Sequence, residues 1–299
     1  MSKLIDKSHQ NAICLLYHTI KTENSFHTNH LFHTKTIDEL EWELDAVAGY
    51  FEFVTVEEFL KVKQDPSNNR RVCLLSFDDG LLECKTLIAP LLLKKQIPAI
   101  FFFNPEFAKG EKIFFRHLVS YTIAQINQKN NLTDQKKKEL FAKLNLFKWS
   151  QENELKEFIF QLDNQIFAEF SKLKLFCSVE ELLWLRSQGF ALGLHTANHP
   201  LLTDLTLEEQ IEQVRNGIEL LQDERIKCFA FPFTDYGIGK DLMAVLKTLF
   251  DCSFGCAGLQ TSSYKNHFQR IPMDDGSLGS IEKLKEEYLY YSLKKSIGK

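Results

Sequence analysis

Two adjacent carboxylates are the first residues of the chain whose type and setting suggest chemistry. Asp78 and Asp79 lie in the segment LLSFDDG, directly after an apolar run, and Gly80 lets the chain turn there. Carboxylates at the end of a buried strand repel each other and are costly to remove from water, and a bound cation relieves both costs. The pair therefore predicts a metal ion nearby, whereas a solvated acidic turn is the ordinary alternative for DDG alone.

Two histidines four residues apart supply further metal donors. His195 and His199 lie in HTANHP, again after an apolar run, where one loop turn can present both imidazoles to a single ion. An isolated pair at this spacing is more often a surface feature than a metal site. Together with Asp79, however, it gives two histidines and one carboxylate, the donor set of a catalytic zinc ion with a position open to water. Cobalt, nickel or iron suit the same donors.

The candidate residues share one position, because each follows the end of a short apolar run. They are His18 after residues 12–17, Asp78 and Asp79 after 72–77, Asn104 after 99–103, and His195 and His199 after 190–194. In parallel α/β folds the carboxyl ends of the strands open on one face, so residues far apart in sequence can converge there. This convergence is the main argument from the residues for an enzyme.

The elements that must position these residues alternate between strand and helix, which predicts an α/β domain. The predicted strands are residues 12–17, 51–54, 72–77, 99–103, 190–194, 228–231, 252–254 and 268–273. Ser/Thr-x-x-Glu capping boxes at residues 36–39, 55–58, 178–181 and 206–209 predict where four helices begin.

One segment interrupts this alternation. Residues 111–188 contain neither Gly nor Pro, and apolar residues of the segment 155–170 recur at helical spacing. We therefore predict a single domain over residues 1–299 with a helical insertion at about 105–178. Since the insertion follows a strand's carboxyl end, we expect it to pack beside the mouth of the site and to restrict substrate size.

Composition excludes several classes of protein. The chain has 36 Lys and Arg against 40 Asp and Glu, a formal charge of -4, which is too balanced for a nucleic-acid-binding protein. No apolar run is long enough to span a membrane, and the first residues lack the features of a signal peptide. The 7 cysteines form no CxxC pair and several lie in apolar runs, so we expect reduced core thiols and a cytoplasmic protein.

Three motifs in order resemble those of the polysaccharide deacetylase family, carbohydrate esterase family four. They are LLSFDDG at residues 74–80, HTANHP at 195–200 and FAFPF at 229–233, accompanied by LLYH at 15–18 and QRIP at 269–272. The resemblance implies a distorted (β/α) barrel, here with about seven parallel strands. It also implies metal-dependent removal of an acyl group, usually N-acetyl, from a sugar or glycoconjugate.

Residue by residue, the resemblance assigns Asp79, His195 and His199 to the metal and Asp78 to the general base. The chemistry is consistent, since a metal would polarise the amide carbonyl and the attacking water while Asp78 takes the water's proton. The backbone N–H of Phe233 is the implied donor to the oxyanion.

Two departures from the family pattern leave roles to be filled. Ala230 stands where many members have an arginine beside the base, and Arg270 is the candidate replacement. The C-terminal Leu-x-His that often supplies the general acid is absent, because no histidine follows His267. His18, His267, or Asp78 returning its own proton remain the candidates for the acid.

Other readings of the sequence stay open. A barrel that binds a glycan without turnover would explain the missing acid, and an amidase or deformylase acting on a non-polymeric substrate would use the same site chemistry. His27, His30 and His33 lie three residues apart but have no accompanying acids, so we expect loop and surface histidines there.

Overall fold

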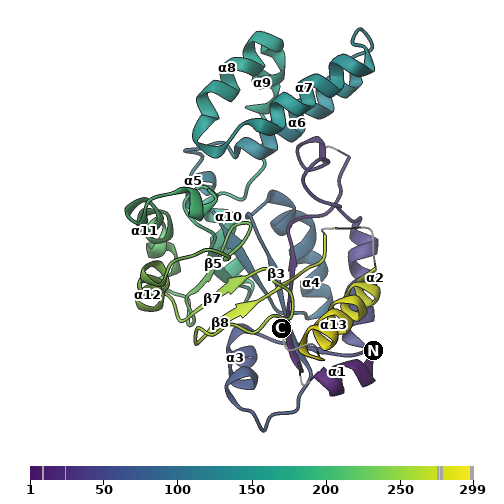
Figure 1. Ribbon diagram of the computed structural model, residues 1–299, viewed down its shortest axis with the longest axis vertical. Helices are drawn as coiled ribbons and strands as arrows, with labels where there is room; N and C mark the ends of the chain where they lie inside the picture. The colour runs from purple at the N-terminus through teal and green to yellow at the C-terminus, as the bar shows by residue number, and fades with distance from the viewer. Residues whose placement is uncertain (9, 24, 275, 277–278, 297–299) are drawn as a thin grey trace.

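The computed structural model describes residues 1–8, 10–23, 25–274, 276 and 279–296. At its centre is a parallel β-sheet that curls into a barrel and is surrounded by helices (Figure 1). In order along the sheet, its strands are β8 (His267–Gln269), β7 (Cys252–Gly255), β6 (Cys228–Ala230), β5 (Ala191–Leu194), β4 (Ala99–Phe103), β3 (Val72–Phe77), β1 (Ala12–Tyr17) and β9 (Ile271–Pro272). A short strand, β2 (Glu52–Phe53), pairs with the start of β3.

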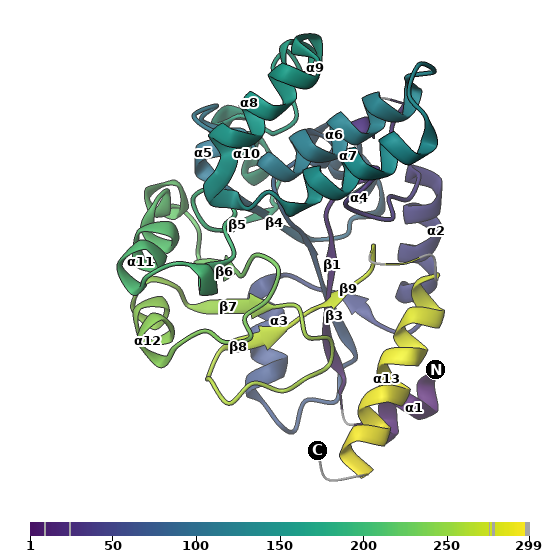
Figure 2. The ribbon, with the colours of Figure 1, turned by 45° about the horizontal axis from the view of Figure 1, so that its top comes forward.

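The barrel is closed by one strand that is broken at Arg270. Its first half, β8, pairs with β7, and its second half, β9, pairs with β1 on the other side of the gap (Figure 2). If β8 and β9 are counted as one broken strand, the barrel has seven strands among the described residues. The short strand β2 pairs with β3 and lies outside this series. The expected (β/α) barrel of about seven parallel strands is therefore confirmed.

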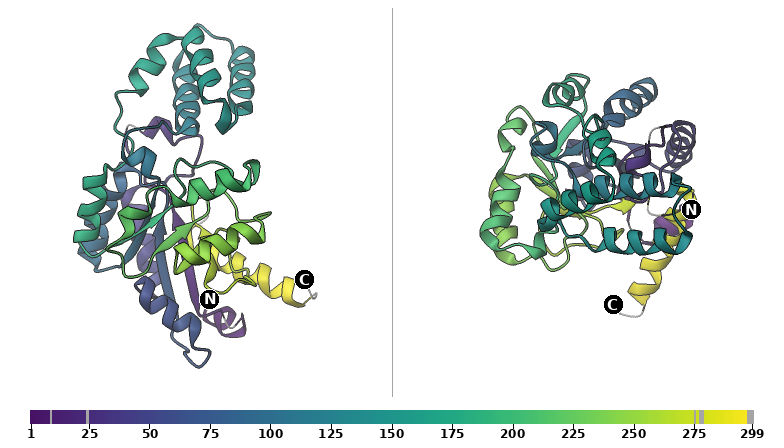
Figure 3. Two further views of the ribbon diagram at one scale, coloured as in Figure 1. Left: turned by 90° about the vertical axis from the view of Figure 1, so that its left-hand side faces the viewer. Right: turned by 90° about the horizontal axis from the view of Figure 1, so that it is seen from above.

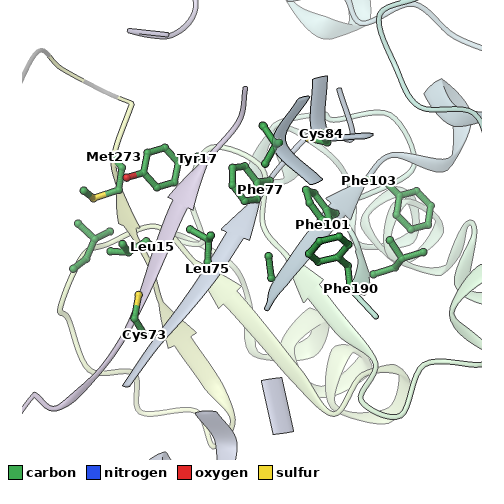
Figure 4. Close-up of a cluster of buried hydrophobic side chains, with 14 of the residues drawn as sticks. Leu15, Tyr17, Cys73, Leu75, Phe77, Cys84, Phe101, Phe103, Phe190 and Met273 are labelled. Atoms are coloured by element: carbon green, nitrogen blue, oxygen red, sulfur yellow. The ribbon is translucent and has the colours of Figure 1, made fainter. Parts of the chain in front are cut away.

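Alternate strand residues fill two separate layers, as the period of two requires. Cys14, Leu74 and Phe102 face the barrel interior. There the Phe102 ring packs against Phe254 of the non-adjacent strand β7, with 5.6 Å between the ring centroids. Residues such as Leu15 and Phe101 face outwards and pack under the helices, together with the other side chains drawn in Figure 4. The apolar runs that predicted β1, β3 and β4 are thus buried on both faces.

The helices of the barrel are α2 (Ile37–Ala48), α3 (Val56–Gln64), α4 (Ala89–Lys95), α10 (Val179–Ser187), α11 (Leu207–Arg215) and α12 (Lys240–Leu249). Four of them, α2, α3, α10 and α11, begin directly after the predicted capping residues, whereas α4 and α12 have no side-chain cap. Thr36, Ser178 and Thr206 form full capping boxes with the glutamate three residues on. Thr55 accepts a hydrogen bond from the amide of Glu58, and its hydroxyl alone caps α3.

The two ends of the chain lie together outside the barrel. Helix α13 (Ser280–Ser296) packs against α1 (Ser2–Ser8) and α2 (Figure 1). Within the described part of the chain, no helix combines the length and the apolar character needed to cross a membrane. All seven cysteines are unpaired and six of them are buried, as the reduced core predicted from the sequence requires.

The segment between β4 and α10 is helical. It consists of α5 (Pro105–Ala108), α6 (Phe115–Gln128), α7 (Asp134–Leu146), α8 (Glu152–Leu162) and α9 (Asn164–Phe170), and α6–α9 lie above the barrel (Figures 1 and 3). Leu118, Ile126, Leu144 and Leu155 are among the fully buried members of its own hydrophobic core. We refer to residues 105–178 as the insertion.

The insertion is fixed to the loop that follows β1. His117 of α6 and His27 share a hydrogen bond between their Nδ1 atoms at 2.9 Å, and Ser120 donates to the carbonyl of Phe26. The expectation of a surface position is wrong for His27, which is 4% exposed because α6 covers it, whereas His30 and His33 are exposed.

Candidate metal centre

Three donor atoms converge at the carboxyl ends of β3 and β5. The Oδ1 atom of Asp79 lies 3.2 Å from Nε2 of His199 and 3.6 Å from Nε2 of His195. One donor atom from each residue can be chosen so that all lie within 4.8 Å of one another, and all three residues are buried. The structure therefore brings together the two histidines and the carboxylate that the motifs singled out.

Strained turns carry these side chains into position. Asp79 (φ 72°), Thr196 (φ 63°), His199 (φ 62°) and Phe233 (φ 58°) all adopt the left-handed conformation that disfavours residues with a Cβ. Such strain persists only where surrounding contacts impose it, and it is typical of functional sites. Here the Thr196 hydroxyl accepts a hydrogen bond from the His199 amide and donates to the carbonyl of His195.

The orientation of His195 leaves one ring nitrogen free for a ligand. Its Nδ1 lies 2.9 Å from the carbonyl oxygen of Ala230, which can only accept, so the proton is on Nδ1 and the lone pair on Nε2. Burial lowers the pKa of His195 to about 4, so the ring is neutral at physiological pH. The side-chain amide of Asn104 holds the same loop by donating to the carbonyls of His195 and Thr196.

The donors fit a divalent cation. Asp79 Oδ1 and His199 Nδ1 are buried and have no hydrogen-bond partner among the described residues. Burial alone would raise the pKa of Asp79, but His199 outweighs it, and the pKa is held well below its usual range. A neutral imidazole, an ionised carboxylate and an unsatisfied buried oxygen are what a catalytic metal site of this donor set requires.

A second buried charge pair lies beside these donors. Arg270, which is fully buried, donates from Nη1 and Nη2 to the two carboxylate oxygens of Asp78 at 2.6 and 2.8 Å. Burial would raise the pKa of Asp78, but the guanidinium lowers it further than burial raises it. Asp78 Oδ2 lies 3.6 Å from Nε2 of His195, so a carboxylate fixed as an anion stands next to the donor group.

His18 forms another pair in the same pocket. Its Nδ1 lies 3.0 Å from Oδ2 of Asp274, its amide donates to that same oxygen, and its ring stacks on Phe32 at 4.1 Å. Burial would lower the pKa of His18, but the Asp274 carboxylate reverses the shift and raises it to about 9. His18 is therefore a protonated side chain at neutral pH.

Phe233 occupies the turn after β6. Its left-handed backbone is held by a hydrogen bond from the Cys256 thiol to its carbonyl, while its N–H has no partner among the residues described here. Its ring, 40% exposed, contacts the His199 ring edge-on at 4.6 Å. The structure thus leaves a backbone donor free close to the metal donors.

A cavity of about 320 Å³ joins these groups. It is lined by His18, Asp78, Asp79, His195, His199, Phe233, Cys256 and Asp274, together with apolar side chains. The insertion contributes Phe114 and Arg116 to the same wall, so it borders the cavity as expected. Trp149 of the insertion also donates to the carbonyl of Asn198, between the two histidines.

His267, one candidate for the acid, lies elsewhere. Its Nε2 is bound to Asp235 at 2.9 Å and its Nδ1 to Ser253 at 2.8 Å, so both ring nitrogens are occupied. It does not line the cavity that contains the metal donors. Its position at the start of β8 places it beside Asp235 and Ser253.

Several residues in and around the cavity are not predictable from the motifs. Asp274 is the partner of His18, and its one signal is that it follows the end of β9 as the other candidates follow their strands. The same signal marks Asn104 but does not indicate that it holds the histidine loop. Phe114 and Arg116 carry no sequence signal, because only the packing of the insertion directs them to the site.

Comparison with known proteins shows the fold. No protein-family model matches the chain, and no curated protein matches it by sequence. Among solved structures, it is similar to the Streptococcus pyogenes deacetylase PplD in complex with acetate, with 14% identity, a TM-score of 0.59, and 92% of this chain and 97% of that chain covered.

Two further structures agree with this match. IcaB from Ammonifex degensii is 16% identical with a TM-score of 0.58, and the match covers 92% of this chain and 96% of that one. A polysaccharide deacetylase from Bacillus cereus is 13% identical with a TM-score of 0.54, and the match covers 92% of this chain and 68% of that one. Each of the three matches thus covers nearly the whole of this chain.

Proposed function

We propose that this chain, which has the fold of the polysaccharide deacetylases, is a metal-dependent hydrolase that removes an acyl group, N-acetyl in the first instance, from a sugar or glycoconjugate. The observation that carries the proposal is the convergence of Asp79, His195 and His199 beside a carboxylate fixed by Arg270. A site that only bound glycans would have no use for a buried base next to unsatisfied metal donors.

The proposed metal ligands are Asp79, His195 and His199, and the proposed ion is zinc. When bound there, a divalent ion would polarise the acyl carbonyl and lower the pKa of the attacking water. The hydrogen bond from His195 to Ala230 keeps the other nitrogen of that ring available as a ligand.

Asp78 is the proposed general base. Its two oxygens are fixed by Arg270, so it stays ionised and oriented next to His195 and can accept the proton of the attacking water. Arg270 thereby takes the role of the cation partner that Ala230 cannot supply. The backbone N–H of Phe233 is the proposed donor to the oxyanion that forms as water adds to the carbonyl.

His18 is the proposed general acid. It lines the same cavity as Asp78, and with a pKa of about 9 it carries a proton at neutral pH that it can give to the leaving nitrogen. Asp274 orients the ring and stabilises its charge. The C–N bond breaks, and water is divided between a carboxylic acid and a free amine.

The substrate class rests on the similar structures. One is a deacetylase in complex with acetate, and another is a polysaccharide deacetylase, which supports an acetylated saccharide for this chain. The predicted compartment is the cytoplasm, where the seven thiols would stay reduced.

The test is acyl release by purified protein reconstituted with zinc, cobalt, nickel or iron. Acetate and formate are measured with N-acetylglucosamine oligomers and with formylated amines as substrates. We expect acetate from the sugars, and Asp78→Asn should lower kcat by about two to four orders of magnitude while the metal stays bound. Formate alone would indicate a deformylase, and glycan binding without any turnover by the metal-loaded protein would contradict the hydrolase.

A further inference from the structure

Arg116 is the one cationic side chain lining the catalytic cavity that has no carboxylate partner in the described part of the chain. The carboxylates that line the cavity are Asp78, Asp79 and Asp274. Their partners are Arg270 for Asp78, His199 for Asp79 and His18 for Asp274. The cavity therefore presents one guanidinium whose charge no lining carboxylate balances.

The helix that carries Arg116 offers it no counter-charge either. The sequence of α6, FRHLVSYTIAQINQ, contains no Asp or Glu, so no acid lies at the spacing of three or four residues that would pair with it. The guanidinium instead lies over the ring of Phe233 at 4.9 Å and near that of Phe115 at 5.6 Å. These contacts fix its position, and its N–H donors have no hydrogen-bond partner among the residues that the structure describes.

The position of Arg116 is close to the proposed chemistry. The Phe233 ring beneath it contacts the His199 ring at 4.6 Å, so a single aromatic side chain separates the guanidinium from a proposed metal ligand. The rest of this wall is apolar, with Phe114, Leu31 and Phe32 lining the cavity. A sugar whose acyl group lies at the metal donors would reach Arg116 with a group on its own ring.

From this geometry we infer that Arg116 binds an anionic group, a phosphate or a carboxylate, carried by the acylated sugar. The inference rests on the proposed function and narrows its substrate class to anionic saccharides or glycoconjugates. A planar guanidinium can donate two parallel hydrogen bonds to either anion. Its hydrogen bonds to a neutral hydroxyl are weaker, because the hydroxyl carries no opposite charge.

The experiment compares neutral and anionic forms of one sugar. The substrates are N-acetylglucosamine, its 1-phosphate, its 6-phosphate, and N-acetylmuramic acid, which adds a carboxylate to the same ring. For each we measure kcat/KM with wild-type protein, Arg116→Gln and Arg116→Lys. Arg225→Gln is the matched control, because Arg225 is also an exposed arginine but does not line the cavity.

We expect wild-type protein to prefer at least one anionic sugar to N-acetylglucosamine by about tenfold or more, the usual worth of a charge-assisted contact. Arg116→Gln should remove most of this preference, Arg116→Lys should keep part of it, and Arg225→Gln should leave it unchanged. Added salt should weaken the preference, because the contact is partly exposed. The phosphate and carboxylate arms show which anion is bound.

Equilibrium binding of the same sugars, measured by calorimetry, separates this inference from the proposed function. If no sugar is hydrolysed but binding of an anionic sugar still depends on Arg116, the proposed function fails and the inference stands. If neutral and anionic sugars are hydrolysed and bound equally well, and Arg116→Gln behaves like Arg225→Gln, the inference is wrong and the hydrolase stands.

Discussion

At the scale of single residues, the candidate centre depends on how each ring nitrogen is used. His195 donates its Nδ1 proton to the Ala230 carbonyl, which leaves the Nε2 lone pair free for the proposed metal ion, whereas His18 is bound through Nδ1 to Asp274. One histidine is therefore held neutral and the other protonated. The same type of side chain can thus be a metal ligand at one strand end and a general acid at another, as proposed above.

Replacing His195 by alanine should abolish tight metal binding, because it removes one of the three proposed donors and leaves only Asp79 and His199. Metal content after dialysis, measured by mass spectrometry, checks this. His30→Ala is the control, since His30 is exposed. A His195→Ala protein that retained one tightly held equivalent of metal would show that the ligands are assigned wrongly.

The pair of His18 and Asp274 predicts a pH dependence. Asp274 raises the pKa of His18 to about 9, against the opposing effect of burial, so the acid is present below that pH and is lost as pH rises through it. Asp274→Asn removes the raising effect and leaves burial, so the alkaline limb of kcat/KM should move to lower pH.

The measurement is kcat/KM from about pH 6 to 10 with metal content monitored. Asp235→Asn is the control, because Asp235 holds His267 outside the cavity and should not move the limb. An unchanged limb in Asp274→Asn would exclude His18 as the acid.

At the scale of elements, the turns after the strands are the parts that sequence changes should disturb most. Gly80 follows the two acids with φ +65°, and a Cβ there would lie 2.9 Å from the Cβ of Phe103 on the neighbouring strand β4. The turn thus needs glycine for two reasons, its backbone conformation and the close approach of β4.

Gly80→Ala should lower the free energy of unfolding by about 2–4 kcal/mol, the sum of a left-handed alanine and an overpacked contact. Gly110→Ala is the matched control: Gly110 has φ +72°, but a Cβ added there would meet nothing within 4 Å, so only the backbone cost of about 1–2 kcal/mol should appear. Urea unfolding of both variants tests this. Equal losses would mean that the contact with Phe103 is relieved at no cost.

The broken strand at Arg270 is the element that completes the site. Because β8 ends before Arg270 and β9 begins after it, the residue between them belongs to neither ladder, and its side chain enters the barrel beside Asp78. Its Nε also donates to the carbonyl of Gly255 at the end of β7. The residue at the break in the closing strand therefore also fixes the Asp78 carboxylate.

At the scale of the whole molecule, the insertion borders the site. It supplies Phe114 and Arg116 to the cavity wall, and Trp149 binds the loop between the two histidines. A structure beside the mouth restricts how a long chain can extend from the bound sugar. We therefore propose that the barrel supplies the catalytic residues and that the insertion limits the length of the substrate.

We therefore predict that long polymers such as chitin are poorer substrates than short acetylated sugars, by about tenfold or more in kcat/KM, since each lost binding contact of about 1.4 kcal/mol costs that factor. The check is acetate release from an oligomer series of increasing length under identical conditions. Equal kcat/KM for the polymer and the short sugar would show that the insertion leaves the long substrate unobstructed.

The barrel and the three candidate metal donors are predictable from the amino-acid sequence alone. Apolar runs such as Val72–Phe77 and Ala99–Phe103 predict strands with these same bounds, because a strand buried on both faces must be continuously apolar. Asp79, His195 and His199 could be predicted because each closely follows such a run, and parallel strands expose their carboxyl ends on one face. These signals are local, so a single sequence contains them.

The pairing of charges, in contrast, depends on the tertiary structure. Asp78 and Arg270 are separated by 192 residues, and His18 and Asp274 by 256, so no local pattern relates them. The sequence leaves His18, His267 and Asp78 as candidates for the acid, and only the structure shows that His267 is bound to Asp235 outside the cavity. Arg116 reaches the cavity only because α6 is packed there. The physical reason is that barrel closure and helix packing set these distances, whereas sequence spacing sets only the periodicity of each element.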